Sequence, residues 1–299
     1  MEIKGIGNKT LITIFTPTYD RAFSLPILYK SLQEQESKNF EWLVIDDGST
    51  DNTKALFERW QKENNSFDIT YVYKQNGGKH RAINEGVKLA KGELFFIVDS
   101  DDFIAPNATK RIAEMYAQIK DNNFFAGISA MRADFNGNRI GGKADFDIID
   151  TSMTEIRTKY KIKGDMAEVF RTEILKFYPF KEFKGENFLE ERTVWDEISK
   201  RYLMRFLNEN LYFCEYLPGG LSHIRGRSVK FPQGSMYASL SIIKNRHYSF
   251  WDKFRAICVY WKAYFFAPSK KRPELKPLWW MYVFYPLGII FFVAEKFKK

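Results

Sequence analysis

Cysteine and histidine are scarce in this chain. Its 299 residues include two cysteines, Cys214 and Cys258, and three histidines, and none shows the close spacing of a metal site or a redox pair. We therefore expect both cysteines to be reduced, as in a protein that faces the cytosol. The opening segment is polar, and the apolar run after it is too short for a secretory signal, so we expect none here.

The chain also lacks an apolar run of the about 20 residues that a straight membrane-spanning helix needs. Residues 278–294 form a charge-free run of 17 residues, in which Pro286 and Gly288 would bend a helix. A single span stays open as an alternative. An anchor that lies in the membrane interface, or re-enters the membrane, fits this length better.

Acidic residues are few near the C-terminus. Residues 220–299 hold 15 basic and 3 acidic side chains, whereas residues 1–219 hold 31 and 34. Residues 250–265 place aromatic and aliphatic side chains on one face of a helix, with basic groups elsewhere. This pattern predicts that residues 226–299 are a basic, aromatic-rich helical tail that associates with an anionic membrane surface.

Two alternatives explain the same tail. Residues 236–266 could pack on the rest of the protein, or the positive charge could bind nucleic acid. We expect no nucleic-acid partner, because the aromatic residues form an apolar stripe and not the scattered stacking platforms that bind bases.

Strand-like and helix-like segments alternate through the first part of the chain. The predicted strands cover residues 11–19, 40–48, 68–74 and 93–99, and the helices that follow them end near residues 35, 63, 92 and 119. This order predicts an α/β fold in which a mostly parallel sheet is flanked by helices. Polar residues follow every strand, and we expect them to meet at the edge where such sheets bind ligands.

The pattern changes after residue 124. Residues 124–142 predict a strand, an Asn-Gly turn and a partner strand. Residues 167–175 and 190–203 predict helices, and residues 211–217 predict another strand. We expect this part to extend the sheet and to supply the pocket of a second substrate.

Three acids in "FFIVDSDDFIAP" follow the fourth predicted strand: Asp99, Asp101 and Asp102. Two carboxylates with one residue between them suit Mg²⁺ or Mn²⁺, since such hard cations fill their other positions with water and phosphate oxygens. The alternative is an acidic turn that caps the next helix. "IDDGSTD" and "GGKHR" follow neighbouring strands, and their acids and cations suit a nucleoside and a diphosphate.

The segments "TIFTPTYDR", "VIDDGSTDNT", "NGGKHRAINEGVKLAKGE" and "FFIVDSDD" resemble the successive motifs of family 2 glycosyltransferases. The resemblance covers roughly residues 10–105 and continues more weakly to about residue 220. It implies the GT-A fold, a Rossmann-like sheet, over residues 1–225. Residues 1–105 would bind the nucleotide sugar, and residues 106–225 would form the acceptor side.

The resemblance also implies roles for individual residues. Asp101 would bind the metal directly, Asp99 would contact the ribose or the metal, and Asp102 would support or cap the turn. The implied nucleotide-sugar-binding residues are Thr16, Pro17, Thr18, Tyr19, Asp46, Asp47, Lys79, Arg81, Asp99, Ser100 and Asp101.

In "LEERTVWDE" the implied catalytic base is Glu191, with Asp196 as second choice. The base would take the proton of an acceptor hydroxyl as its oxygen attacks the anomeric carbon, which inverts the configuration. His223 and Arg225 could join Arg227 against the diphosphate.

The function implied is the transfer of one sugar from a nucleotide-diphosphate sugar, such as a UDP-sugar, to a hydroxyl of a glycan. Processive polysaccharide synthases of the same broad family carry a Gln-x-x-Arg-Trp motif and several membrane spans, and this chain has neither, which argues for the transfer of a single sugar. With the tail, this implies a lipid-linked acceptor in cell-surface polysaccharide synthesis, at the cytoplasmic face of the membrane. The alternatives are a sugar nucleotidyltransferase and a membrane-tethered protein that binds sugar nucleotides without turnover.

Overall fold

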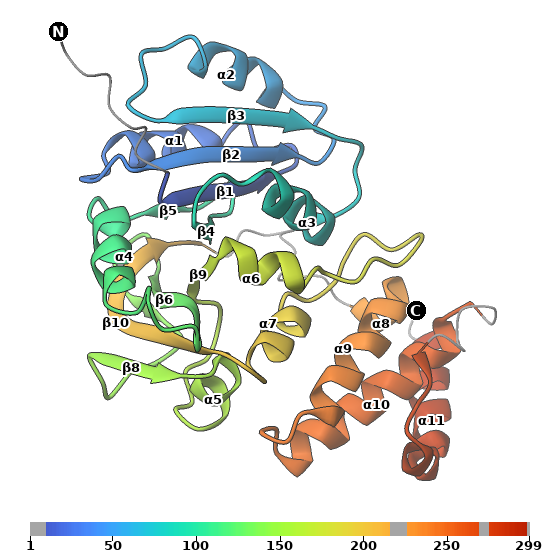
Figure 1. Ribbon diagram of the computed structural model, residues 1–299. Coiled ribbons are helices and arrows are strands. Elements are labelled where there is room, and N and C mark those ends of the chain that lie inside the picture. The colour runs from blue at the N-terminus through green and yellow to red at the C-terminus, as the bar shows by residue number, and fades with distance from the viewer. Residues whose placement is uncertain (1–9, 216–225, 269–274, 298–299) are drawn as a thin grey trace, which may run out of the picture. The chain divides into compact units, whose positions relative to one another are not determined.

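The computed structural model describes residues 10–215, 226–268 and 275–297 (Figure 1). The chain divides into two compact units. Unit 1 comprises Met1–Thr151, Ile162–Pro179 and Tyr202–Glu215, and unit 2 comprises Ser152–Lys161, Phe180–Arg201 and Tyr216–Lys299. Each unit is therefore built from segments that are not contiguous in the sequence.

Unit 1 begins with a parallel sheet of four strands. Strand β1 (Ile12–Thr18) pairs with β2 (Phe40–Asp46) and β4 (Leu94–Ile97), and β2 pairs with β3 (Asp68–Tyr73). Every residue of β1, β2 and β4 is buried, as expected for strands covered on both faces. The connecting helices are α1 (Leu25–Gln33), α2 (Thr53–Trp60), α3 (Lys79–Leu89) and α4 (Ala108–Ala117). The predicted alternation of strands and helices is confirmed for this part.

Alternate residues of β1 face different helices. Ile12 and Ile14 join a buried cluster that contains apolar residues of α1, α2 and α4. Phe15 points to the opposite face, because side chains alternate along a strand. There it meets Gly86 of α3 so closely that a Cβ at Gly86 would lie 2.2 Å from the ring. Helices therefore cover both faces of the sheet.

The rest of the sheet is mixed. Its order is β3-β2-β1-β4-β9-β6-β10-β5, with β7 beside β6 and β8 beside β10. The added strands are β5 (Phe103–Ile104), β6 (Phe125–Ala133), β7 (Arg139–Ile140), β8 (Ile148–Thr151), β9 (Ala167–Arg171) and β10 (Leu203–Phe213). Strand β9 runs antiparallel to both β4 and β6, whereas β6 and β10 are parallel. The prediction of a mostly parallel sheet is thus wrong beyond β4.

Two sequence assignments in this part need correction. Residues 167–175 were expected to be one helix, but Ala167–Arg171 form β9 and only Thr172–Phe177 form a helix, α6. This short buried segment, which includes the charged residues Glu168 and Arg171, has no period that separates strand from helix, and here the sheet neighbours decide. The predicted helix at 190–203 is shorter, since α7 covers Arg192–Ile198 and β10 starts at Leu203. The hairpin of β6 and β7 is confirmed.

Unit 2 is helical. It contains α5 (Met153–Thr158), α7, α8 (Arg227–Lys230), α9 (Pro232–Lys244), α10 (Phe250–Phe266), η3 (Trp279–Phe284) and α11 (Tyr285–Lys296). Helix α10 packs on α9 and α11, and it starts at a capping box in which the Ser249 and Asp252 side chains bond to each other's backbone. Trp261, at its centre, is fully buried and donates from Nε1 to the Met281 carbonyl at 2.8 Å.

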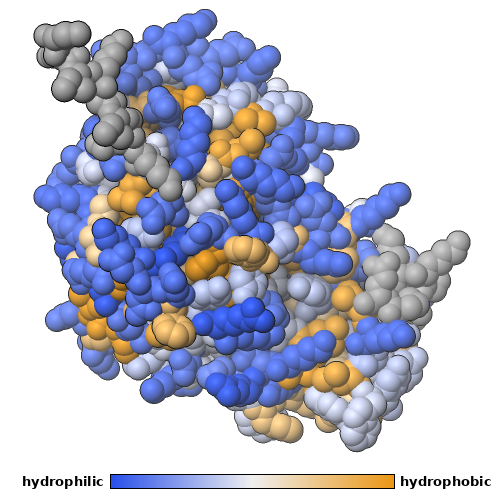
Figure 2. All heavy atoms as spheres, in the orientation of Figure 1, coloured by the Kyte–Doolittle hydropathy of each residue, from blue (hydrophilic) through white to orange (hydrophobic). Residues whose placement is uncertain are grey.

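The apolar stripe predicted for residues 250–265 is divided in the structure. Ile257 and Trp261 are buried, but Phe250 is 70% exposed. More apolar side chains lie exposed on η3 and α11, among them Trp279 at 84% and Val283 at 76%. Orange and pale spheres gather over these helices in Figure 2, whereas those over α2 are mostly blue. Among the described residues, no helix has both the length and the apolar character that crossing a membrane requires.

Candidate functional site

The loops after β1 and β2 are tied together at the carboxyl end of the sheet. Asp20 lies in the first quoted motif, "TIFTPTYDR", and its carboxylate accepts a hydrogen bond from the Thr50 backbone N–H at 2.7 Å. The Asp20 N–H donates to the Ser49 hydroxyl at 2.8 Å. The Asp47 N–H donates to the Thr18 carbonyl at 2.8 Å. The "TPTY" and "DDGSTD" motifs therefore form one connected edge.

Asp47 links this edge to the glycine turn. Its carboxylate accepts from the Lys74 ammonium at 2.6 Å and from the backbone N–H groups of Gly77 and Gly78 at 2.9 and 2.6 Å. Gly78 has φ of 95°, a conformation that side-chain-bearing residues rarely adopt, and α3 begins directly after it. One buried carboxylate thus shapes the turn that places Lys79 at the start of α3.

Lys79 and Arg21 face the two acids predicted to bind metal. The Lys79 ammonium lies 2.6 Å from the Asp99 carboxylate, and Arg21 Nε lies 3.6 Å from the Asp101 carboxylate. Burial opposes ionisation of Asp99, but Lys79 and Arg132 outweigh it and hold the pKa of Asp99 below its usual value. Burial and the neighbouring Asp99 instead raise the pKa of Asp101, against the opposing effect of Arg21.

Asp102 is held in a buried network with Tyr212. The Tyr212 hydroxyl donates to the Asp102 carboxylate at 2.5 Å and accepts from the Asp99 N–H at 3.0 Å. The Arg132 guanidinium lies over the Tyr212 ring at 4.0 Å and 4.0 Å from the Asp102 carboxylate. Burial, followed by the charge of Asp99, raises the pKa of Asp102 to about 8. Asp102 thus connects the turn to Tyr212 of β10 and supports it, as one of its two expected roles requires. It does not cap α4, whose N-cap residue is Asn107.

The predicted nucleotide-binding residues differ in exposure. Tyr19 is 48% exposed, whereas Thr16 and Asp46 are fully buried. Thr16 accepts a hydrogen bond from Trp42 Nε1 at 3.0 Å, and Asp46 accepts from the Ser49 N–H at 2.7 Å and the Tyr71 hydroxyl at 2.5 Å. A ligand would reach Asp46 only by displacing these contacts.

Other predicted residues line the same edge in different ways. The Thr18 hydroxyl is buried and makes no hydrogen bond to any described residue, so it could donate a hydrogen bond to a ligand or accept one from it. Pro17 and Ser100 are buried, and the Ser100 carbonyl accepts from the Ser24 hydroxyl at 2.9 Å. Arg81 donates to the Gly77 carbonyl. The binding roles of all these residues stay predictions.

The donor set at Asp99 and Asp101 fits a hard divalent cation. Their side chains are 26% and 22% exposed, whereas the Asp102 side chain is buried, with 6% exposed. No group of three His, Cys, Asp or Glu residues suited to metal is found in the described part of the chain. Mg²⁺ needs only one or two protein carboxylates, because water and phosphate oxygens complete its coordination. Asp99 and Asp101 are the accessible carboxylates that would hold such an ion.

The candidate bases lie in unit 2. Glu191 precedes the first residue of α7, is partly exposed, and its carbonyl accepts from the Val194 N–H at 3.0 Å. Asp196 is 3% exposed, and its carboxylate accepts hydroxyl hydrogen bonds from Thr154 and Tyr248 at 3.0 Å. Such a set of donors is typical of a carboxylate that holds segments together. His223 and Arg225 lie outside the described residues.

Sequence reasoning missed three contributors to this site: Arg21, Arg132 and Tyr212. Arg132 did carry a signal, because it is a lone charge inside the buried strand β6 and a buried charge needs partners. Tyr212 carried none, since it reaches Asp99 from 113 residues away. Arg21 stood inside a quoted motif, but its partner Asp101 comes from another loop.

Residues 13–206 match the family model described as Glycosyl transferase family 2. A relative from Campylobacter jejuni, GalNAc(5)-diNAcBac-PP-undecaprenol beta-1,3-glucosyltransferase, is 27% identical over 197 residues, which are 63% of this chain and 60% of that protein.

Two solved structures have a similar fold. The structure of TarS from S. aureus in complex with UDP-GlcNAc superposes with a TM-score of 0.65 at 18% sequence identity. The match covers 95% of this chain and 81% of the TarS chain. The mannosyltransferase PcManGT from Pyrobaculum calidifontis, in complex with GDP-Man and Mn²⁺, gives 0.53 at 16% identity and covers 97% and 87%. At these identities the likeness concerns the fold alone.

Proposed function

The chain belongs to glycosyl transferase family 2 and is a transferase, and from that premise we propose that it moves one sugar from a nucleotide-diphosphate sugar to a hydroxyl of a glycan, with inversion. The observation that carries the proposal is the Asp99–Asp101 turn at the end of β4. It lies against Lys79 and Arg21, next to the glycine turn that Asp47 organises. Carboxylates for a metal and cations for a diphosphate are what a nucleotide-diphosphate donor requires.

The roles of the chain's own residues follow from their chemistry. Asp99 and Asp101 would hold Mn²⁺ or Mg²⁺, which when bound offsets negative charge on the leaving diphosphate. Lys79, at the start of α3, would add a positive charge on the same side. The unpartnered Thr18 hydroxyl and the exposed Tyr19 ring would contact the nucleoside. UDP is the nucleotide we propose, supported by the fold shared with a protein that binds UDP-GlcNAc.

Glu191 is the proposed base. The acceptor oxygen would form a bond to the anomeric carbon while the bond from that carbon to the diphosphate oxygen breaks. The acceptor's proton would pass to the Glu191 carboxylate, and the nucleoside diphosphate would leave. Asp196 is the second choice, but its burial and its hydroxyl donors favour a structural task.

The proposed acceptor is a lipid-linked glycan used in cell-surface polysaccharide synthesis, at the cytoplasmic face of the membrane. Two observations support it: a relative is named for a substrate on an undecaprenol diphosphate, and η3 and α11 expose large apolar side chains. Through residues 226–299 the protein would associate with the membrane surface. The proposed domains remain residues 1–225 for catalysis, with a donor half at 1–105 and an acceptor half at 106–225.

A panel of sugar nucleotides with Mn²⁺ or Mg²⁺ tests the proposal by the release of nucleoside diphosphate. Asp101→Asn and Glu191→Gln should each lower transfer at least a hundredfold, because each removes a charge that the reaction uses. Glu197→Gln is the matched control, since Glu197 lies on α7, about two turns after Glu191, and pairs with the nearby Lys200 at 2.6 Å. Full activity of both site variants would refute the assignment. Release of inorganic diphosphate from a nucleoside triphosphate would favour a nucleotidyltransferase.

A further inference from the structure

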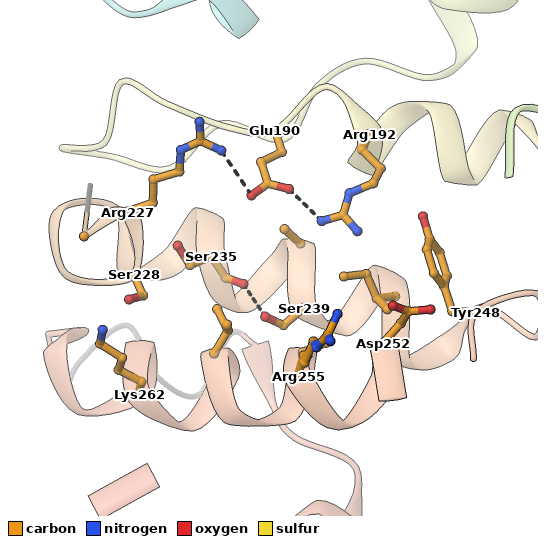
Figure 3. Close-up of a pocket in the computed structure, with 15 residues that line it drawn as sticks. Glu190, Arg192, Arg227, Ser228, Ser235, Ser239, Tyr248, Asp252, Arg255 and Lys262 are labelled. Atoms are coloured by element: carbon orange, nitrogen blue, oxygen red, sulfur yellow. Dashed lines mark hydrogen bonds and ion pairs between the residues drawn. The ribbon is translucent and has the colours of Figure 1, made fainter. Parts of the chain in front are cut away.

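Unit 2 contains a cavity of about 760 Å³, whose lining includes Arg227, expected from the sequence to meet a diphosphate, but none of the residues to which the proposed reaction gives a role. Figure 3 shows that its walls come from α8, α9, α10 and the residues that lead into α7. The volume lies within the range of about 300–1,000 Å³ that is usual for small-molecule sites.

The walls carry an excess of positive charge. Four cations line the cavity, Arg192, Arg227, Arg255 and Lys262, against two acids. The acid Glu190 already lies between two of these cations, 2.6 Å from Arg192 and 3.8 Å from Arg227. The lining therefore keeps a formal excess of two positive charges.

The second acid of the lining is also engaged. The Asp252 carboxylate accepts from the Ser249 hydroxyl at 2.6 Å and from the Ser249 N–H at 3.3 Å, in the capping box of α10. In Figure 3 the charged ends of Arg192, Arg255 and Lys262 reach from opposite walls into the space between α10 and the segment with Glu190. These cations face the cavity from different elements.

One face of α10 combines charge with apolar surface. Arg255, Val259 and Lys262 follow the i, i+4, i+7 spacing of one helix face, so the two cations stand about 10 Å apart along the axis. Val259 between them is 42% exposed, and Ile242 of α9 lines the same cavity. Ser228 and Ser235 add hydroxyl groups to the lining. Such a surface suits an anion and tolerates an apolar neighbour.

We propose that this cavity binds a phosphate or diphosphate group, carried either by a lipid or by a soluble ester. Arginine guanidinium groups bind phosphate oxygens through paired N–H donors, the lysine adds a point charge, and serine hydroxyls donate to the remaining oxygens. A carboxylate has fewer oxygens and less negative charge than a phosphate or diphosphate. It would therefore interact with fewer of the cations, which lie on three walls of the cavity. The site goes beyond the proposed function, because it assigns unit 2 an anion-binding task of its own.

The test compares two double variants of the full chain that lose the same charge. Arg255→Gln/Lys262→Gln removes two cations of the cavity. Lys244→Gln/Lys253→Gln removes two cations of α9 and α10 that do not line it. Binding of inorganic diphosphate is measured by titration calorimetry, and thermal unfolding checks that both variants fold. We expect at least a tenfold weaker affinity in the cavity variant and a change below twofold in the control.

A second arm identifies the source of the phosphate, with vesicles of neutral phosphatidylcholine, with or without anionic phosphatidylglycerol. Cavity-dependent binding to the anionic vesicles, with competition by inorganic diphosphate, supports a lipid phosphate. Diphosphate binding that needs the cavity, with equal vesicle binding in both variants, supports a soluble ester. Equal loss in both variants, or no diphosphate binding by the unmodified chain, overturns the proposal. Donor turnover, followed in parallel, tests the proposed function separately.

Discussion

Replacing Tyr212 with phenylalanine should loosen the turn that carries Asp99 and Asp101. The Tyr212 side chain is fully buried, and its hydroxyl bridges the Asp99 N–H at 3.0 Å and the Asp102 carboxylate at 2.5 Å. Phenylalanine keeps the ring that packs under Arg132 and removes only that oxygen. The substitution therefore isolates the bridge between β10 and the turn.

The size of the effect follows from the two groups left behind. A buried polar group that loses its partner costs about 1–3 kcal/mol. The Asp99 N–H loses the bridge entirely, whereas Asp102 retains Arg132 at 4.0 Å, so its loss lies at the lower end. We expect the free energy of unfolding to fall by roughly 2–4 kcal/mol. We also expect the rate of sugar transfer to fall about tenfold, because the Asp99 carboxylate, proposed to hold the metal, would be less precisely placed.

Urea unfolding and the release of nucleoside diphosphate measure the two effects. Tyr116→Phe is the matched control: Tyr116 is 2% exposed and donates to Glu93, which directly precedes β4, whereas Asp99 follows that strand. It should lose about 1 kcal/mol of stability, as for one hydrogen bond, and keep full activity. Equal, small losses of stability in both variants with unchanged transfer would refute the bracing role of Tyr212.

Three further changes have defined outcomes. Lys79→Met removes the cation that lowers the pKa of Asp99, so it should destabilise the metal-free protein at pH 7 by about 1 kcal/mol. The loss in the free energy of unfolding should shrink as the pH falls through the folded pKa of Asp99, which lies below its usual value, and a loss that does not change with pH would contradict this. Burial raises the pKa of Asp196, so its stabilising contribution is full below pH 4 and is lost as the pH rises through the folded value. Asp196→Asn should flatten that decline in urea unfolding, and an unchanged slope would count against it. Trp279→Ser/Val283→Ser changes side chains that are 84% and 76% exposed, so it should reduce vesicle binding several-fold without lowering the melting temperature, and undiminished binding would exclude this surface as the anchor.

The first part of the fold was predictable because its signals are local. Strands β1, β2 and β4 are largely apolar, the partly exposed β3 is rich in β-branched and aromatic residues, and polar residues follow each of the four. The helices between and after them have their own period. Beyond β4 the local signal fails. Residues 167–171 are a short segment of mixed apolar and charged residues that reads equally well as helix, and only the pairing with β4 and β6 makes them a strand.

Contacts between residues that are far apart in the sequence account for most of what the structure adds to the predicted site. The sequence indicates that Asp99 and Asp101 need compensating charge, but not that Lys79 and Arg21 stand opposite them at 2.6 and 3.6 Å. Both partners belong to quoted motifs, so their types were visible and their pairing was not. The same holds for Glu190, whose two arginine partners come from different helices.

The sequence alone determined the family motifs, their order, and the polar edge of the sheet, since parallel strands deliver the residues after them to one side. Tertiary structure alone decided how the like charges of the turn are tolerated. A lysine, an arginine and a tyrosine hydroxyl reach Asp99, Asp101 and Asp102 from other elements. Electrostatic compensation depends on distance in space, and no spacing along the chain encodes a contact from 113 residues away.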